Sequence, residues 1–563
     1  MTRPVLERGA ARHRASAGNR AAPSRRRLAW AAGLVLTAAA LFIAYDRQSG
    51  TVPIRSDGGS VALQAWDMLH GNLLLSHWHM SDVSFWPTEL VQYALLEAAG
   101  GLGPGVIHLG GAMTYTLLLG LAAYLAKGRA RGREALVRVL VVLAVMLAPA
   151  AVESPTLLLT PDHLGSAVPV LLAWLAVDRL AGPPAAPAVA RPAVARQAVR
   201  WALPVLVTLV LAWGQVADGL ILLTGAVPMA VACGARACVR LRHRAPGTFP
   251  ALEASLAGAA VASVLLARGI EALIRISGGY VLGPVATQIT SWDQLPHVAG
   301  LTAQGLAALF GVSFSAAQPW PETLFAVLHL AGLAAAAVAI AAALAHLGRP
   351  GRAGESTDLM LPGLALGIAV NVAAYVVTPY AQDLLSTREI SAVLPFAAVL
   401  AGRQLAAPLM RTPRARAGLA ALAVVLVMGV AALGYHASRP ARAPDNWALA
   451  GWLVAHHLTA GLSTDYWVAN STTLDTRGHV TVRQISINRH WQLTRPVTWG
   501  NRSDWYEPAH YRASFIVVDD ARPGAWTAEW WGAVHAFGRP ARTLHPDGYT
   551  VLVWHRNLLA GIR

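Results

Sequence analysis

Charged residues and cysteine are both scarce in this chain of 563 residues. Asp, Glu, Lys and Arg make up 13% of it and hydrophobic residues 55%, whereas about a quarter of a soluble globular protein is charged. Cys233 and Cys238 are its two cysteines, which excludes a disulfide-rich scaffold and a zinc site built from cysteine clusters. With a mean hydropathy of +0.46, the composition indicates a membrane protein with many spans.

Eleven apolar segments are long enough to be interpreted as membrane spans, since a helix needs roughly 20 residues to cross a bilayer. The predicted spans are Leu28–Tyr45, Val106–Ala126, Ala135–Val152, Leu164–Leu180, Trp201–Ala217, Gly219–Ala235, Phe249–Ala267, Leu324–Ala345, Leu359–Val377, Ile390–Leu405 and Ala417–Leu433. The segment Leu295–Ala317 is open to two interpretations, a helix on the outer surface or an additional span. An additional span would reverse the orientation of everything after it.

The net charge of +16 comes from arginines that cluster in alternate loops, such as "KGRARGREALVR" and "RQLAAPLMRTPRAR". Such a bias orients a membrane protein with its basic loops in the cytoplasm, and it does not predict a nucleic-acid partner. Residues 1–27 are then a basic, disordered cytoplasmic arm. After eleven spans, the C-terminus lies outside the membrane of the cell.

From residue 434 to 563 the apolar runs shorten and Trp, Tyr, Asp and Asn become frequent. The pattern predicts a small extracytoplasmic α/β domain. We expect helices at "NWALAGWLVAHHLTA" and "AWTAEWWGAVHAF" and strands at "DYWVAN", "VTVRQIS", "SFIVVDD" and "YTVLVWH". Trp526, Trp530 and Trp531 either pack this domain or contact sugar, and the sequence favours packing. Residues 28–433 form the transmembrane module.

The first outer loop, residues 46–105, begins with the stretch "SDGGSVALQAWDMLHGN". Val61, Ala65, Met68 and Leu69 fall on one face of the helix that this stretch predicts, which is typical of a helix lying at the membrane surface. Asp57 opens that helix. Two interpretations follow: Asp57 or its neighbour Ser56 caps the helix, or Asp57 is the centre of a chemical site.

The pattern D-x(4)-A-x(3)-D-M-L-x-G-N, followed by "SDVSFWPTELVQYALLEAAGGLG", resembles the first outer loop of the GT-C glycosyltransferases. This superfamily includes the protein O-mannosyltransferases and the aminoarabinose transferases. The resemblance covers Leu28 to Leu180 and returns at "STREISAVLPFAAVLAGR". It implies a polytopic helical enzyme that moves a hexose or pentose from a polyprenyl-phosphate carrier, within the cell membrane, to a glycan, lipid or protein acceptor of the cell envelope.

The resemblance also implies roles for individual residues. Asp57 stands at the position of the family's catalytic base, which takes the acceptor's proton. Arg388 is the candidate for the departing lipid phosphate, since an arginine binds phosphate through two parallel hydrogen bonds. Further candidates for substrate contact lie in the first two outer loops: Asp82, Glu153, Asp162 and His163. For Glu153 and Asp162, a merely polar loop is an equally good interpretation.

Metal use is left open by the sequence. The family often has a second acid directly after the first, whereas Gly58 and Gly59 follow Asp57 here. A divalent cation therefore stays an option, but no metal ligand is assigned. The stretch "SHWHMSD" offers His77, His79 and Asp82, and without a fourth ligand we do not interpret it as a zinc site.

Two other classes of protein compete with the transferase. A transporter or lipid flippase is disfavoured, because the ionisable residues fall at the ends of spans and the chain shows no repeated halves. A non-catalytic partner in envelope assembly, with the same fold, is harder to separate from the enzyme by sequence. Asp218 lies in a tight turn, and turn formation explains it.

Overall fold

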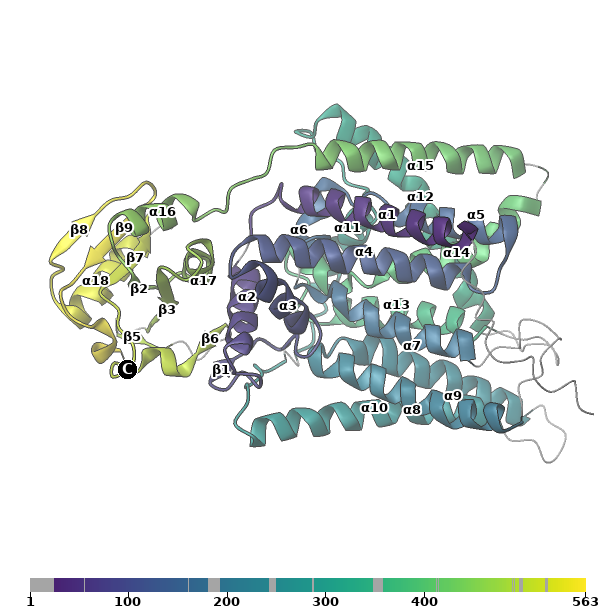
Figure 1. Ribbon diagram of the computed structural model, residues 1–563, viewed down its shortest axis with the longest axis horizontal. Coiled ribbons are helices and arrows are strands. Elements are labelled where there is room, and N and C mark those ends of the chain that lie inside the picture. The colour runs from purple at the N-terminus through teal and green to yellow at the C-terminus, as the bar shows by residue number, and fades with distance from the viewer. Residues whose placement is uncertain are drawn as a thin grey trace, which may run out of the picture.

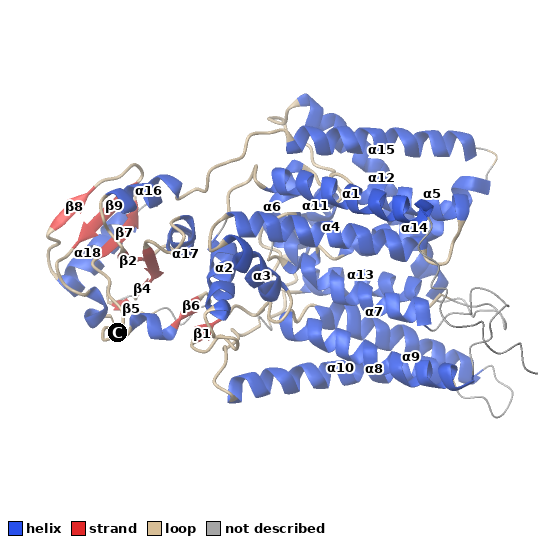
Figure 2. Ribbon diagram, viewed as in Figure 1, coloured by secondary structure: helices blue, strands red, loops and turns tan. Residues whose placement is uncertain are grey.

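The computed structural model describes residues 25–562 except 55, 160, 181–192, 243–249, 286–287, 348–357, 412, 414, 489, 491, 496–499 and 522–524. Almost the whole predicted N-terminal arm lies outside this range. The described chain forms a bundle of long helices with a smaller α/β domain at one end of it (Figures 1 and 2). We call the end of the bundle that carries this domain the domain end.

The long helices follow the apolar segments of the sequence. They are α1 (Arg25–Ser49), α4 (Gly105–Lys127), α5 (Gly132–Met146), α7 (Ala167–Leu180), α8 (Ala193–Ala217), α9 (Val227–Arg242), α10 (Ala251–Ile276), α12 (Trp320–Leu347), α13 (Met360–Val377), α14 (Val393–Arg411) and α15 (Ala415–Ala437). The short turns η2 (His163–Ser166) and η3 (Leu222–Ala226) lead into α7 and α9. Within the described residues, nine helices are long and apolar enough to cross a membrane, and the shorter apolar helix Trp201–Ala217 belongs to α8.

One predicted span is not a straight helix. The sequence predicts Ala135–Val152, but α5 ends at Met146 and the chain bends by 77° before η1 (Ala151–Glu153) and α6 (Ser154–Leu157). Pro149 and Pro155 flank the break, and proline cannot donate the hydrogen bond that would continue a helix. If the pair is counted as one broken span, the number of spanning helices rises to ten.

The ambiguous segment Leu295–Ala317 contains α11 (Leu295–Leu309), which at 15 residues is shorter than a membrane span. It packs against α13 and against η4 (Leu385–Ile390), the turn that precedes α14. A Cβ atom on Gly305 of α11 would lie 1.9 Å from Cγ2 of Thr387 in η4. This close approach requires glycine, and it fixes η4 against the helix.

The first loop folds onto the domain end of the bundle as α2 (Ser56–Leu69), β1 (Trp78–His79) and α3 (Glu89–Gly100). Val61, Ala65 and Met68 of the predicted apolar face of α2 are buried, while Leu69 is 42% exposed. The helix packs against α3 and against α17 (Tyr466–Asp475) of the C-terminal domain. The face predicted to meet the membrane surface is therefore largely covered by protein.

The C-terminal domain contains a five-stranded sheet in the order β3-β2-β7-β9-β8. Its strands are β2 (Ala460–Ser463), β3 (Thr481–Gln484), β7 (Phe515–Asp519), β8 (Arg542–Leu544) and β9 (Tyr549–Val553), and the helices α16 (Trp447–Ala455) and α18 (Ala525–Phe537) accompany it. The pairs β2–β3 and β2–β7 are parallel, and β7–β9 and β8–β9 are antiparallel. Two short pairs stand apart, β1 with β6 (Asn501–Arg502) and β4 (Ser486–Ile487) with β5 (Leu493–Thr494).

Three of the four predicted strands and both predicted helices are present, but the strand predicted at "DYWVAN" is wrong. That stretch opens α17, because the Asp465 carboxylate accepts a hydrogen bond from the backbone N–H of Trp467 at 2.7 Å and caps a helix. The prediction also missed β2, whose first residue, Ala460, is the last residue of the first predicted helix. Among the tryptophans, Trp530 packs on the domain core and Trp531 is 58% exposed; the side chain of Trp526 lies outside the described set.

The C-terminal domain is joined to the first loop by backbone as well as side-chain contacts. Strands β1 and β6 pair antiparallel, with Trp78 opposite Arg502 and His79 opposite Asn501. On the other side, α17 approaches α2 so closely that a Cβ atom on Gly59 would lie 3.3 Å from the backbone of Asn470. The C-terminal domain therefore covers one side of the first loop, on β1 and on α2.

Candidate active site

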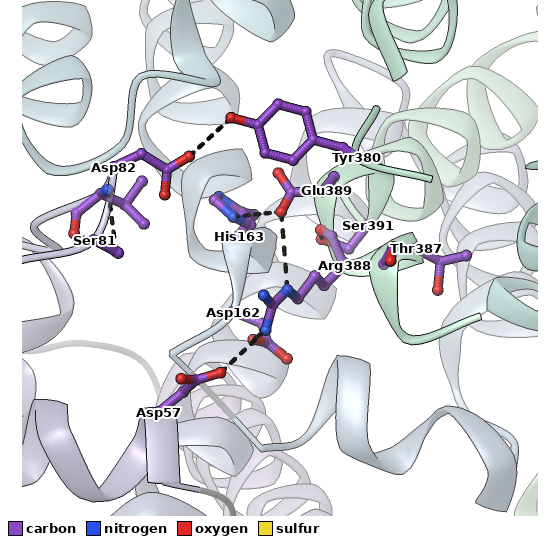
Figure 3. A network of polar contacts seen from close by, with 12 residues as sticks. Asp57, Ser81, Asp82, Asp162, His163, Tyr380, Thr387, Arg388, Glu389 and Ser391 are labelled. Carbon is purple, nitrogen blue, oxygen red and sulfur yellow. Dashed lines mark hydrogen bonds and ion pairs between the residues drawn. The ribbon is translucent and has the colours of Figure 1, made fainter. Parts of the chain in front are cut away.

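Asp57 contacts residues from two distant parts of the chain, and Figure 3 shows its contact with one of them, Arg388. Its Oδ2 lies 3.3 Å from Nη1 of Arg388, and its Oδ1 accepts a hydrogen bond of 2.7 Å from the hydroxyl of Tyr466. Arg388 comes from η4 and Tyr466 from the first turn of α17. The carboxylate at the start of α2 is thus held between the helical bundle and the C-terminal domain.

The guanidinium of Arg388 is surrounded by three acids. Besides Asp57, Nη1 lies 3.6 Å from Oδ1 of Asp162, and Nε lies 3.8 Å from Oε1 of Glu389. Burial of this guanidinium lowers its pKa, but the charges of Asp162, Asp57 and Glu389 outweigh burial, and the pKa of Arg388 lies above its usual value. Arg388 therefore stays a cation. Its three contacts with carboxylates, of 3.3, 3.6 and 3.8 Å, are longer than the usual charge-assisted hydrogen bond, so another anion can replace one of the carboxylates.

His163 extends the network away from Asp57. Its Nδ1 lies 2.9 Å from Oδ2 of Asp218 and its Nε2 lies 3.1 Å from Oε1 of Glu389 (Figure 3). Burial alone would raise the pKa of Glu389, but His163 and Arg388 hold it below the usual value. The chain of contacts therefore keeps Glu389 as an anion and fixes it beside the guanidinium.

Asp82 lies across the site from Asp57. Its Oδ2 accepts a hydrogen bond of 3.1 Å from the hydroxyl of Tyr380, which belongs to the loop between α13 and η4 (Figure 3). Both residues are partly buried. The pair ties the first loop to the loop that carries Arg388.

A polar pocket of about 70 Å³ joins these groups. Its lining comes from the first loop, η2, η4 and the C-terminal domain, and includes Asp57, Ser60, Gln64, Ser81, Asp82, Phe85, Asp162, His163, Arg388, Glu389, Tyr466 and Gly500. A second small pocket, lined by Gly58, Ile107 and Leu385, opens beside Asp57, Asp162 and Arg388. The pockets give a ligand access to both faces of the Asp57–Arg388 pair.

Of the six residues proposed from the sequence, five line the pocket: Asp57, Asp82, Asp162, His163 and Arg388. Glu153 does not line it. This residue is buried in η1, where Thr156 is its side-chain neighbour. The structure thus brings together residues separated by more than 300 positions and leaves Glu153 outside the group.

Sequence reasoning missed Glu389, Tyr466 and Tyr380, and it assigned too little to Asp218. The turn interpretation of Asp218 accounts for one oxygen, which accepts a hydrogen bond from the backbone N–H of Leu220 at 2.9 Å, while the other oxygen faces His163. Glu389 follows Arg388 directly in "STREI", which was a usable signal. Tyr466 lies in a separate domain, and nothing in its local sequence connects it to Asp57.

The divalent cation that the sequence leaves as an option is assigned no ligands by the structure. Nη1 of Arg388 lies within 3.6 Å of the carboxylates of both Asp57 and Asp162. Across the described part of the chain, no group of three or more His, Cys, Asp or Glu residues is placed to hold a metal ion. We therefore derive no step through a metal.

Comparison with known proteins places this arrangement beside one enzyme. No protein-family model and no curated protein matches the chain. Among solved structures, the apo oligosaccharyltransferase of Archaeoglobus fulgidus shares 13% identity at a TM-score of 0.47, over 90% of this chain and 72% of that chain. Its form tethered to an acceptor peptide gives 12% and 0.45, over 90% and 71%.

A third structure, the same archaeal enzyme with an inhibitory peptide and a dolichol-phosphate, gives 12% identity and a TM-score of 0.44, over 92% of this chain and 72% of that chain. At TM-scores below 0.5 the likeness is one of general arrangement. Function is inferred from the residues of the site itself.

Proposed function

We propose that this protein is a membrane glycosyltransferase that moves a sugar from a polyprenyl-phosphate donor to an acceptor of the cell envelope. The reaction takes place at the domain end of the bundle, which we assign to the outer face of the cell membrane from the distribution of arginine between loops. The observation that carries the proposal is the contact between Asp57 and Arg388 inside a polar pocket. The transfer needs a base for the acceptor's proton and a cation for the departing phosphate. The carboxylate of Asp57 and the guanidinium of Arg388 supply these two groups.

In the transfer, the acceptor hydroxyl loses its proton to Asp57, and its oxygen forms a bond to the anomeric carbon of the donor sugar. The bond from that carbon to the phosphate oxygen breaks, and the electron pair leaves with the polyprenyl phosphate. Attack opposite the leaving group inverts the anomeric configuration. Arg388 stabilises the negative charge that develops on the departing phosphate.

The contact of 3.3 Å between Asp57 and Arg388 gives the donor a second role. A carboxylate paired with a guanidinium is a poor base, because the positive charge stabilises its anion. When the donor phosphate binds Arg388, it takes over the hydrogen bond that Arg388 donates to Asp57, while the hydrogen bond from Tyr466 stays and holds the carboxylate in place. Asp57 is then free to accept the acceptor's proton, so the base becomes effective only when the donor is in place.

The remaining groups of the network position these two. Asp162 and Glu389 hold the guanidinium, and His163 contacts the same oxygen of Glu389, Oε1, as Arg388 does. Asp82, fixed by Tyr380, presents its carboxylate to the pocket and is suited to hydrogen-bond a sugar hydroxyl. In these positioning roles, none of the four residues has to gain or lose a proton during the transfer.

The proposal is tested by mass spectrometry of envelope glycans and lipid-linked sugars from cells with and without the protein. We expect that one glycan loses a sugar and that the matching polyprenyl-phosphate sugar accumulates when the protein is absent. The competing interpretation, a non-catalytic partner in envelope assembly, predicts a changed assembly without accumulation of a lipid-linked sugar. The second result would contradict the proposed function.

A further inference from the structure

A third pocket, separate from the two beside Asp57 and with a volume of about 310 Å³, lies between the first loop and the C-terminal domain. Trp66 and Asp67 of α2, Trp78 of β1, and Arg483, Arg502 and Trp505 of the C-terminal domain line it. This volume is at the lower end of the roughly 300–1,000 Å³ of small-molecule sites. The pocket therefore suits one small ligand rather than a long segment of chain.

Asp67, the acid that lines this pocket, has partners on both of its carboxylate oxygens. One oxygen of Asp67 pairs with Nη1 of Arg502 at 2.7 Å, and the other accepts hydrogen bonds from the indole N–H of Trp78 at 2.8 Å and from Asn72 at 2.6 Å. Arg502 is also paired with Asp504. Asp67 and Arg502 belong to the wall of the pocket, and with Asp504 they form a group of two acids and one arginine in which every charge has a partner.

Arg483 is different, because its guanidinium is packed between two aromatic rings. Its Cζ lies 4.4 Å from the ring centre of Trp505 and 4.7 Å from that of Tyr511. Its Nη1 is buried, and no described residue provides a hydrogen-bond partner for that atom. Burial lowers the pKa of Arg483 to about 10, so it is still a cation at neutral pH. A cation that is largely buried without a paired carboxylate is costly, and an anion that reaches the accessible part of the guanidinium lowers this cost.

The aromatic lining adds a second requirement. Trp66 and Trp505 are only partly buried, and both contribute to the pocket wall. Indole rings pack well against the C–H face of a sugar ring, while the pocket's polar groups fix its orientation. A ligand that satisfies both the rings and Arg483 has a flat apolar face and an anionic substituent.

We propose that this pocket binds an anionic sugar unit, with the indoles of Trp66 and Trp505 against the ring and Arg483 on its carboxylate or phosphate. Asp57 and Asp67 lie ten residues apart on α2, which corresponds to about 15 Å along the helix. A short glycan held here at its anionic unit can therefore reach around α2 to the transfer site. The identification of this glycan as the acceptor rests on the proposed function, whereas the binding itself does not.

Equilibrium binding tests the proposal without any transfer step. Isothermal titration calorimetry on the full-length protein in detergent micelles uses glucuronate and glucose 6-phosphate as probes, with glucose, acetate and N-acetylglutamate for comparison. We expect at least one anionic sugar to bind saturably, and whichever binds identifies the substituent as carboxylate or phosphate. The three comparison compounds should bind at least roughly 10-fold more weakly, because each lacks the ring or the charge.

Two substitutions on different elements locate the binding. Arg483→Gln and Trp66→Ala should each weaken it by roughly 10-fold or more, while Arg542→Gln and Trp531→Ala, at exposed positions of the same domain, should leave it unchanged. If Arg483→Gln does not show a cooperative thermal transition, Trp66→Ala decides.

The proposal is overturned if neither anionic sugar binds, or if glucose, acetate or N-acetylglutamate binds as tightly. It is also overturned if the anionic sugar binds equally to Arg483→Gln and Trp66→Ala. A protein that binds glucuronate but shows no sugar transfer in cells would contradict the proposed function and leave this inference standing.

Discussion

The hydroxyl of Tyr466 donates a hydrogen bond of 2.7 Å to the carboxylate of Asp57, although the two residues stand 409 positions apart in the chain. One belongs to the C-terminal domain and the other to the loop after the first membrane helix. The contact places a residue of the C-terminal domain in the candidate site. The domain therefore shapes the environment of the proposed base.

Removing that hydroxyl tests the contribution of the domain. Tyr466→Phe keeps the ring but deletes the hydrogen bond that holds the Asp57 carboxylate in position, and a misplaced catalytic group can cost up to about 10² in rate. We expect the transferred sugar to fall roughly 10-fold or more in cells, measured by mass spectrometry of the envelope at matched protein level. Tyr549→Phe is the control, since that hydroxyl bonds Asn446 within the same domain. Equal effects of the two variants would mean that Tyr466 acts through stability.

Arg388→Lys keeps the positive charge but loses the planar fork that matches a phosphate. We expect it to lower product formation by at least roughly 10-fold and to raise the donor concentration needed for half-maximal rate in membranes supplied with lipid-linked sugar. The matched control is Arg268→Lys, in an exposed ion pair with Glu271 on α10. A lysine variant with parental rate and donor dependence would remove Arg388 from phosphate binding.

Glu89 gives a prediction on pH. Its carboxyl is buried against the turn that carries His163, so close that a Cβ atom on Gly165 would lie 1.7 Å from Oε1. Burial, helped by the charge of Asp218 and opposed by Thr88 and His163, raises the pKa of Glu89 from 4.5 to about 7. Between pH 4.5 and 7 the folded protein holds a proton that the unfolded chain has released, so this group's contribution to stability falls as pH rises.

The measurement is the midpoint of thermal unfolding of the purified protein between pH 5 and 7. In the parent it should fall as pH rises, and Glu89→Gln should make that dependence weaker because the glutamine does not titrate. The remaining slope comes from groups such as Asp475, whose pKa burial likewise raises to about 7. Glu507→Gln, on an exposed surface pair with His510, should keep the parental slope. A slope unchanged in Glu89→Gln would show that Glu89 is not the titrating group.

The sequence predicted the helical bundle and most of the residues that line the candidate site for physical reasons that are local. Span-length apolar runs give membrane helices, and the positions of Asp57 and Arg388 beside such runs place them at span ends. Two features escaped prediction although their signals are local: Pro149 and Pro155 accompany the bend after Met146, and Asp465 caps the helix at Tyr466. The pairing of β1 with β6 and the contact of Tyr466 with Asp57 escaped because they join distant segments. Glu153 illustrates the converse, an acid in the right loop that is turned into the protein.

The orientation of the protein stays a prediction from its arginines. An enzyme that is active only outside the cytoplasm, such as a periplasmic phosphatase, should be active when fused after Arg563 and inactive when fused after Arg200. The expected pattern follows from an odd number of spans before the C-terminal domain. An inactive fusion at Arg563 would place the proposed site on the cytoplasmic face and contradict the use of an externally presented lipid-linked donor.

The central claim is that Asp57 is the base of the transfer, and Asp57→Asn tests it most directly. Asparagine keeps the size of the side chain and its ability to cap a helix, but it cannot accept the acceptor's proton. Loss of a general base costs about 10² to 10⁴ in rate. With the variant at parental protein level, mass spectrometry of the envelope should therefore find the product absent and the lipid-linked sugar accumulated. An Asp57→Asn protein that restores the product in full would contradict the account.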